Sequence, residues 1–74
     1  MCMRAFVLLN VEMNREAEVK GKLEAIEGVK ASTVYGVYDV VVELSREVES
    51  DLKNAVMEIR RIDGVNSTLT LLVT

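Results

Sequence analysis

The stretch Ile26-Glu27-Gly28-Val29 recurs near the end of the chain as Ile62-Asp63-Gly64-Val65. Each copy follows apolar residues at helical spacing and precedes a run rich in β-branched residues. A glycine just beyond a helix commonly takes a left-handed conformation that ends it. We therefore interpret each copy as the exit of a helix into a strand, which divides the chain into two βαβ halves.

The first of these helices is expected to begin at Asn14, because asparagine is a favoured residue at helix N-termini. Its apolar stripe is at Val19, Leu23 and Ile26, whose spacing places them on one side of a helix. Gly28 then ends the helix.

The second helix could be capped by either Ser45 or Ser50. Arg60 and Arg61 would stabilise its C-terminus, because the helix dipole favours positive charge there. The apolar residues that recur at helical spacing in this segment are Leu52, Val56, Ile59 and Ile62.

Four stretches that lack proline and are rich in apolar or β-branched residues are expected to be strands: 4–11, 29–35, 38–44 and 65–73. The second and third are close enough in sequence to form a hairpin. Right-handed crossovers then place both helices on one face of a four-stranded antiparallel sheet. We therefore predict an α+β fold, the ferredoxin-like βαββαβ sandwich, with residues 1–74 forming a single domain.

The composition argues against several classes of function. Nine Lys and Arg stand against twelve Asp and Glu, and the net charge of −3 is unsuited to direct contact with nucleic acid. There is no histidine, and Cys2 is the single cysteine. We therefore expect no metal, no cofactor and no enzymatic activity. Because neither a signal peptide nor a long apolar run is present, we expect a cytoplasmic protein without a membrane partner.

The predicted sheet is apolar on both faces. Alternation along the last strand directs Leu69, Leu71 and Val73 toward the helices. The opposite face then carries Phe6, Leu8, Val34, Val41 and Leu72. Large apolar patches are uncommon on monomers, so we predict that a second copy covers this face in a sheet-to-sheet dimer. A bulge would reverse some of these orientations and is the alternative interpretation.

Two groups of polar residues could bind a ligand. Asp39 follows Gly36 at the hairpin turn, while Thr68 and Thr70 share the face of the last strand that we assign to the partner. A zwitterionic amino acid would satisfy both groups: its ammonium would donate to Asp39, and the hydroxyls and the amides near Gly36 would donate to its carboxylate. In the simpler alternative, Asp39 caps the turn, Gly36 supplies a positive φ, and the threonines are ordinary strand residues.

The run Gly36-Val37-Tyr38-Asp39-Val40-Val41-Val42, the exit Ile62-Asp63-Gly64-Val65 and the segment Thr68-Leu69-Thr70 together resemble the effector-binding (RAM) domain of the Lrp/AsnC family of transcription regulators. The resemblance covers essentially the whole chain. It implies sheet-to-sheet dimers, rings that commonly contain four dimers (an octamer), and an amino acid bound between dimers. The residues that it implies for the effector site are Gly36, Tyr38, Asp39, Thr68 and Thr70.

Full-length members of that family carry an N-terminal helix-turn-helix DNA-binding domain, whereas this sequence begins directly with a predicted strand. We therefore expect a stand-alone module that senses an amino acid and acts by oligomerising with itself or with full-length relatives. An ACT-like feedback-binding module has the same element order and is an alternative. From other classes, the alternatives are a small enzyme resembling the acylphosphatases or the dimeric α+β-barrel oxygenases, and a pure scaffold.

Overall fold

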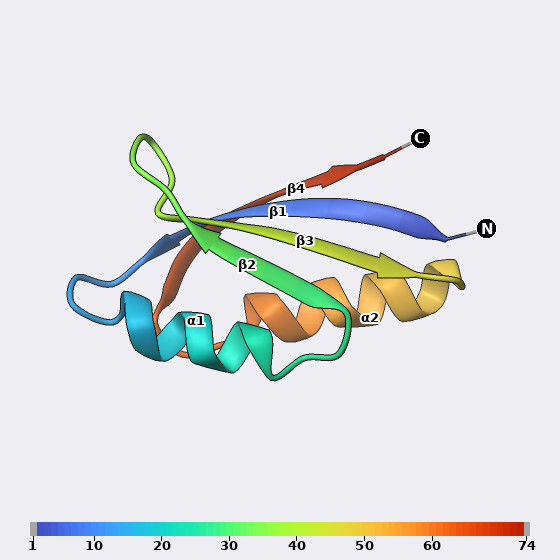
Figure 1. Cartoon of the computed structure of the whole chain (residues 1–74), viewed down its shortest axis with the longest axis horizontal. Helices are drawn as coiled ribbons and strands as arrows, with labels where there is room; N and C mark the ends of the chain where they lie inside the picture. Colours follow the sequence, from blue (N-terminus) through green and yellow to red (C-terminus); the bar gives the residue numbers. More distant parts are fainter. Residues whose placement is uncertain (1, 74) are drawn as a thin grey trace.

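The computed structural model of the protein describes residues 2–73 and confirms the predicted βαββαβ order (Figure 1). Both helices lie on the same side of the sheet, and the hairpin loop between β2 and β3 projects beyond it (Figure 1). The elements are β1 (Met3–Val11), α1 (Glu16–Glu24), β2 (Val29–Thr33), β3 (Val40–Arg46), α2 (Glu49–Arg60) and β4 (Val65–Leu72). Neither helix is long and apolar enough to cross a membrane.

The sheet has the strand order β2-β3-β1-β4, and every neighbouring pair is antiparallel. Chain neighbours β2 and β3 form the predicted hairpin, whereas β4 returns to pair with β1. This arrangement is the ferredoxin-like sandwich. It leaves β2 and β4 as the two edge strands and puts the end of β1 beside the hairpin loop.

The core lies between the sheet and the helices. Along β1, alternate residues from Ala5 to Val11 are buried, as the period of a strand requires. The predicted helix stripes are confirmed, since Val19, Leu23, Leu52, Val56 and Ile59 are buried and Ile26 and Ile62 pack against them. Within residues 2–73 no polar or charged residue is buried, so the core is aliphatic.

The predicted helix caps are wrong. Asn14 has a φ of 67° and lies in the turn before α1, whose N-cap is Arg15. The N-cap of α2 is Val48, and neither Ser45 nor Ser50 occupies that position. Neither helix start has a side-chain cap hydrogen bond. Both helices have acidic residues in the first turn. Their negative charges interact favourably with the positive end of the helix dipole and need no capping hydrogen bond.

Both repeated glycines have positive φ values, 79° at Gly28 and 103° at Gly64, which confirms that they redirect the chain after each helix. The preceding turns match as well. Ile26 N–H donates to Leu23 O at 3.0 Å, and Ile62 N–H donates to Ile59 O at 3.2 Å. The repeated tetrapeptide therefore builds the same backbone turn twice.

The predicted orientation of β4 is wrong, and a bulge explains the error. Asn10 pairs with Ser67, but the next residue of β1, Val11, pairs with Val65, so Asn66 is an extra residue in β4. An extra residue reverses the alternation beyond it. Leu69 and Leu71, paired with Leu8 and Phe6, therefore lie on the face away from the helices, whereas Thr68, Thr70 and Leu72 lie on the helix side.

The face of the sheet away from the helices, here called the outer face, is apolar at its centre. Phe6, Leu8 and Val41 lie on it as predicted. Leu72 does not, because of the bulge, and Val34 lies beyond the end of β2. Leu69 and Leu71 take their place and are 43% and 47% exposed. The apolar residues that neighbour one another across this face are Phe6, Leu8, Val41, Leu69 and Leu71.

Candidate functional site

The Asp39 carboxylate fastens the hairpin loop to the end of β1. Its Oδ2 accepts a hydrogen bond from Val11 N–H at 2.9 Å. The backbone of Asp39 is held on both sides, because its N–H donates to Leu9 O at 2.8 Å and its carbonyl accepts from Val34 N–H at 2.9 Å. Three bonds therefore fix the position of this carboxylate, and within residues 2–73 Oδ1 is left without a hydrogen bond.

A pocket of about 350 Å³ opens next to this carboxylate, and we call it the hairpin pocket. Its lining comes from the start of α1, the end of β2 and the hairpin loop, and comprises Glu16, Thr33, Val34, Tyr35 and Asp39. Two carboxylates and two hydroxyl groups line it without any cationic side chain. Such a lining is suited to an ammonium group, which can donate three hydrogen bonds.

The loop that closes the hairpin contains free backbone donors, and its first residue, Tyr35, lines the pocket. The amides of residues 35–38 make no backbone hydrogen bond within the described part of the chain. Gly36 has a φ of 142°, and no atom lies within 4 Å of the place where a Cβ would be. Gly36 is therefore required by the backbone conformation and not by close packing. Exposed loop amides of this kind can donate to a carboxylate.

Only part of the predicted effector site comes together within one chain. Gly36, Tyr38 and Asp39 share the hairpin loop, but only Asp39 lines the pocket, and Tyr38 is half-buried. Thr68 does not line the hairpin pocket, and Thr70 lines a separate groove beside α2. The predicted role of the two threonines opposite Asp39 therefore depends on a neighbouring chain and stays a prediction.

Four lining residues, Glu16, Thr33, Val34 and Tyr35, are absent from the effector site predicted from the sequence. Thr33 could have been found, because it follows Val29 and Ala31 at strand spacing and these pack toward the helices. Glu16 lies far from Asp39 in sequence, and only the packing of α1 against β2 brings it near. No local pattern in the sequence signals that contact.

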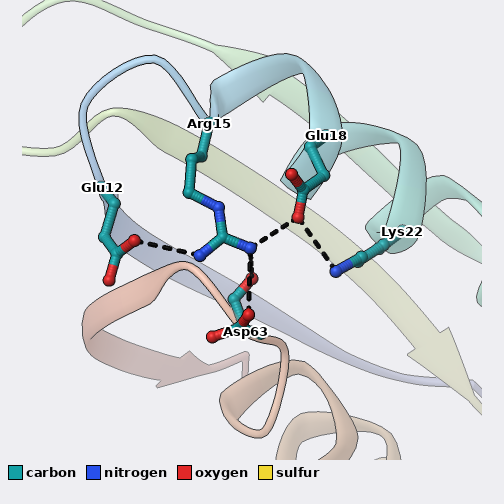
Figure 2. A network of polar contacts seen from close by, with 5 residues as sticks. All are labelled: Glu12, Arg15, Glu18, Lys22 and Asp63. Atoms are coloured by element: carbon teal, nitrogen blue, oxygen red, sulfur yellow. Dashed lines mark hydrogen bonds and ion pairs between the residues drawn. The ribbon is translucent and has the colours of Figure 1, made fainter.

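A second polar cluster joins the start of α1 to the turn that follows α2 (Figure 2). The Arg15 guanidinium contacts three carboxylates, those of Glu12 at 3.0 Å, Glu18 at 2.6 Å and Asp63 at 3.1 Å, and Lys22 pairs with Glu18 at 3.1 Å. The hydrogen bond from Arg15, followed by that from Lys22, lowers the pKa of Glu18 to about 2. The same contacts, with Glu18 first, raise the pKa of Arg15.

This cluster contains more ion pairs, and one of longer range in sequence, than the sequence predicts. The sequence suggests ordinary solvated charges on α1 with weak ion pairs, and the exposed pair of Lys22 with Glu18 fits that expectation. Arg15 differs, because its side chain is only 26% exposed and reaches Asp63 of the other half. The cluster therefore has a structural role, and none of its residues lines the hairpin pocket.

No protein-family model matches the chain, and no curated protein matches it. Solved structures do match. FFRP-DM1 is 32% identical with a TM-score of 0.91, and the match covers 97% of this chain and 99% of that one. Hypothetical protein PHS023 from Pyrococcus horikoshii is 34% identical with a TM-score of 0.89, and the match covers 100% and 90%.

AsnC from E. coli is a longer protein with the same fold in one part. The match has 23% identity and a TM-score of 0.86, and it covers 96% of this chain but 50% of AsnC. The likeness to AsnC shows the fold, and the identity to FFRP-DM1 over nearly its full length shows the relationship. The chain therefore belongs to the FFRP, or Lrp/AsnC, family of regulatory proteins and has the fold of its RAM domain.

Proposed function

We propose that the protein is a non-enzymatic regulatory domain that senses an amino acid at the hairpin pocket. One observation carries the proposal: Asp39 lines the hairpin pocket and is anchored through Oδ2, while its Oδ1 and the loop amides of residues 35–38 make no hydrogen bond within residues 2–73. The shared fold adds support from one distant neighbour. Transcriptional regulator NMB0573 from Neisseria meningitidis, 13% identical with a TM-score of 0.80, was solved as a complex with L-Met.

In this proposal, the two ends of a zwitterion meet complementary groups. The ammonium donates to Asp39 Oδ1 and to the carboxylate of Glu16, which line the same pocket. The ligand carboxylate accepts from the amides of the loop around Gly36. Thr68 and Thr70 of a neighbouring chain would complete the site, as the sequence predicts. The absence of cations from the lining disfavours free anions as ligands, because two carboxylates would repel them.

Calorimetric titration with the individual L-amino acids tests this proposal. Asp39→Asn keeps an oxygen that can accept from Val11 N–H but removes the charge that holds the ammonium. A hydrogen bond to a charged group contributes roughly 1.5–3 kcal/mol, so we expect binding to weaken by roughly ten- to a hundredfold. The matched control is Asp51→Asn, which makes the same change on the exposed first turn of α2. Sensing is disproved if no amino acid produces heat in the assembled protein.

We further propose that the outer face forms the dimer, and that dimers assemble further and with full-length relatives. The in-register apolar residues of this face form a continuous patch on β3, β1 and β4. Arg4 and Glu43, 3.8 Å apart, lie on the same face and provide polar groups beside the patch. Burial of apolar surface contributes about 25 cal/mol per Å², so covering the patch favours association. A cytoplasmic location stays a prediction from the sequence.

Sedimentation velocity tests the dimer. Leu8→Asp puts a charge in the middle of the patch, and we expect it to shift the protein from dimer or larger species to monomer at micromolar concentration. Asn54→Asp, which adds the same charge on exposed α2, should leave the distribution unchanged. Circular dichroism verifies that both variants are folded. A monomeric wild-type protein at these concentrations would refute the dimer but would leave the calorimetric test of the pocket standing.

A further inference from the structure

The hairpin pocket has more negative charge than a neutral amino acid can neutralise. Glu16 and Asp39 both line it, and no cationic side chain does. A neutral amino acid has a single ammonium, which these two carboxylates would have to share. A ligand with a second positive group would instead provide each carboxylate with its own cation.

The protein itself neutralises neither carboxylate. Within residues 2–73, no basic side chain forms an ion pair with Glu16 or Asp39. Asp39 Oδ2 accepts its hydrogen bond from the uncharged amide of Val11, and over the same residues the Glu16 side chain makes no hydrogen bond. Both carboxylates are therefore available to a cationic ligand.

The basic residues nearest to Glu16 in the sequence are poor competitors for it. Arg15 is already bound to three other carboxylates, and Figure 2 shows its guanidinium between them. Lys20, one helical turn further along α1, does not line the pocket and makes no ion pair in the described part of the chain. Pairs at this spacing on a helix surface are weak, so Lys20 would not exclude a ligand.

Completion of the site by a neighbouring chain would make an unneutralised carboxylate costly. Glu16 and Asp39 are already half-buried in one chain. Thr68 and Thr70, predicted to approach from the neighbour, are uncharged and would displace water without adding a cation. A carboxylate that loses water and gains no opposite charge is strongly disfavoured. A second cation on the ligand removes this penalty, so the pocket should select for it.

We propose that the effector of the hairpin pocket is an amino acid with a cationic side chain, such as lysine, ornithine or arginine. This inference rests on the proposed function and specifies the class of amino acid that is sensed. Asp39 belongs to the same loop as the free amides, so it binds the α-ammonium while the amides bind the α-carboxylate on the same carbon. Glu16, in the first turn of α1, binds the cation at the end of the ligand side chain.

The remaining lining is suited to the aliphatic part of such a side chain. Val34 and the ring of Tyr35 provide apolar surface on which methylene groups can pack. Tyr35 is also fully exposed in one chain, and the face of an aromatic ring attracts cations. The pocket volume of about 350 Å³ is at the lower end of the range for ligand pockets, as expected for a single amino acid.

The inference is tested by calorimetric titration of the assembled full chain with L-lysine and L-norleucine. Norleucine has the same α-groups and an unbranched aliphatic side chain, but it lacks the terminal ammonium. We expect the wild-type protein to bind lysine about tenfold or more tightly than norleucine, because a site built to bind a charged group rejects an analogue without it. This comparison uses one protein and does not depend on the folding of any variant.

The role of Glu16 is tested by Glu16→Gln, which keeps the size of the side chain and removes its charge. It should weaken lysine binding by about tenfold or more and norleucine binding much less. Glu24→Gln is the matched control, because it makes the same change at an exposed position of α1 outside the pocket and should alter neither affinity. Circular dichroism verifies that both variants are folded.

The possible failures are distinguishable. Equal affinities for lysine and norleucine, or equal effects of Glu16→Gln and Glu24→Gln on lysine binding, would overturn this inference and leave amino-acid sensing intact. Absence of heat with every amino acid would overturn the proposed function and this inference with it. Cadaverine has two ammonium groups and no carboxylate, so it should bind more weakly than lysine. Equally tight binding of cadaverine would overturn the inference in favour of a diamine.

Discussion

The two βαβ halves of the chain have the same helix exit but different surroundings. In both halves a positive-φ glycine follows the helix, and the turn before it has the same hydrogen bonds. Gly28 is exposed, whereas Gly64 is buried under the side chains of Arg15 and Val19. The comparison shows that a repeated motif determines a backbone turn, while its tolerance to substitution depends on what the rest of the fold packs against it.

The contacts of a Cβ at each glycine make this difference concrete. At Gly64 a Cβ would lie 3.0 Å from Val19 Cγ2 and 3.2 Å from Arg15 Cζ. The valine is in the core, and the guanidinium is held by three carboxylates. At Gly28 the nearest atom is Arg46 Nη1 at 2.7 Å, the end of a flexible side chain. Only the neighbours of Gly64 are unable to move freely.

The largest effect on stability is therefore expected from replacing each glycine by alanine in a separate variant. A positive φ costs an L-residue about 1–2 kcal/mol, and this strain is common to the two variants. Gly64→Ala adds overlap with fixed atoms, so we expect a total loss of about 2–3 kcal/mol in the free energy of unfolding. Gly28→Ala should lose about 1 kcal/mol less, since Arg46 can turn aside. Urea denaturation measures both, and equal losses would contradict the comparison.

A smaller and pH-dependent effect is expected from the Arg15 cluster, which has no counterpart in α2. The pKa of Glu18 is lowered from 4.5 to about 2, so its ion pairs stabilise the folded state fully above about pH 4.5. This stabilisation is lost as the pH falls toward 2. Arg15→Gln should lower the urea midpoint at pH 7, and the difference from wild type should shrink between pH 4.5 and 2.

The matched control for this pH profile is Glu49→Gln in the second half. It removes the ion pair with Lys53, whose two side chains are 61% and 67% exposed. Exposed pairs of this kind contribute little, so the urea midpoint should stay close to that of wild type across the range. A constant offset between Arg15→Gln and wild type down to pH 2 would show that Arg15 acts through packing and not through its charge.

The halves also differ in the sites that they provide. The first half ends in the short edge strand β2 and leads into the hairpin pocket with its carboxylates. The second half ends in the longer edge strand β4 beside a groove whose charged residues are basic. The charged residues that line the two pockets therefore have opposite signs, acidic in the hairpin pocket and basic in the groove.

The element order, the helix stripes and the glycine turns are predictable from the sequence because each depends on residues close together in the chain. The inward alternation of β1 and β3 is predictable for the same reason. The orientation of β4 is not, because the bulge at Asn66 is visible only in the pairing with β1. Of the residues predicted for the effector site, only Asp39 lines the hairpin pocket, and the site itself stays a prediction. The presence of Glu16 in that lining is not predictable from the sequence, since it depends on how α1 packs.

By itself, the sequence determined where the chain turns and which residues prefer helix or strand, because periodicity and glycine conformation are local properties. Only the tertiary structure decided that Leu69 and Leu71 face away from the helices, that Asp39 holds Val11, and that Arg15 joins Glu18 to Asp63. The orientation of β4 and the contacts of Asp39 with Val11 and of Arg15 with Asp63 depend on residues far apart in the sequence. Strand register and helix packing establish them, and no pattern within one segment can specify them.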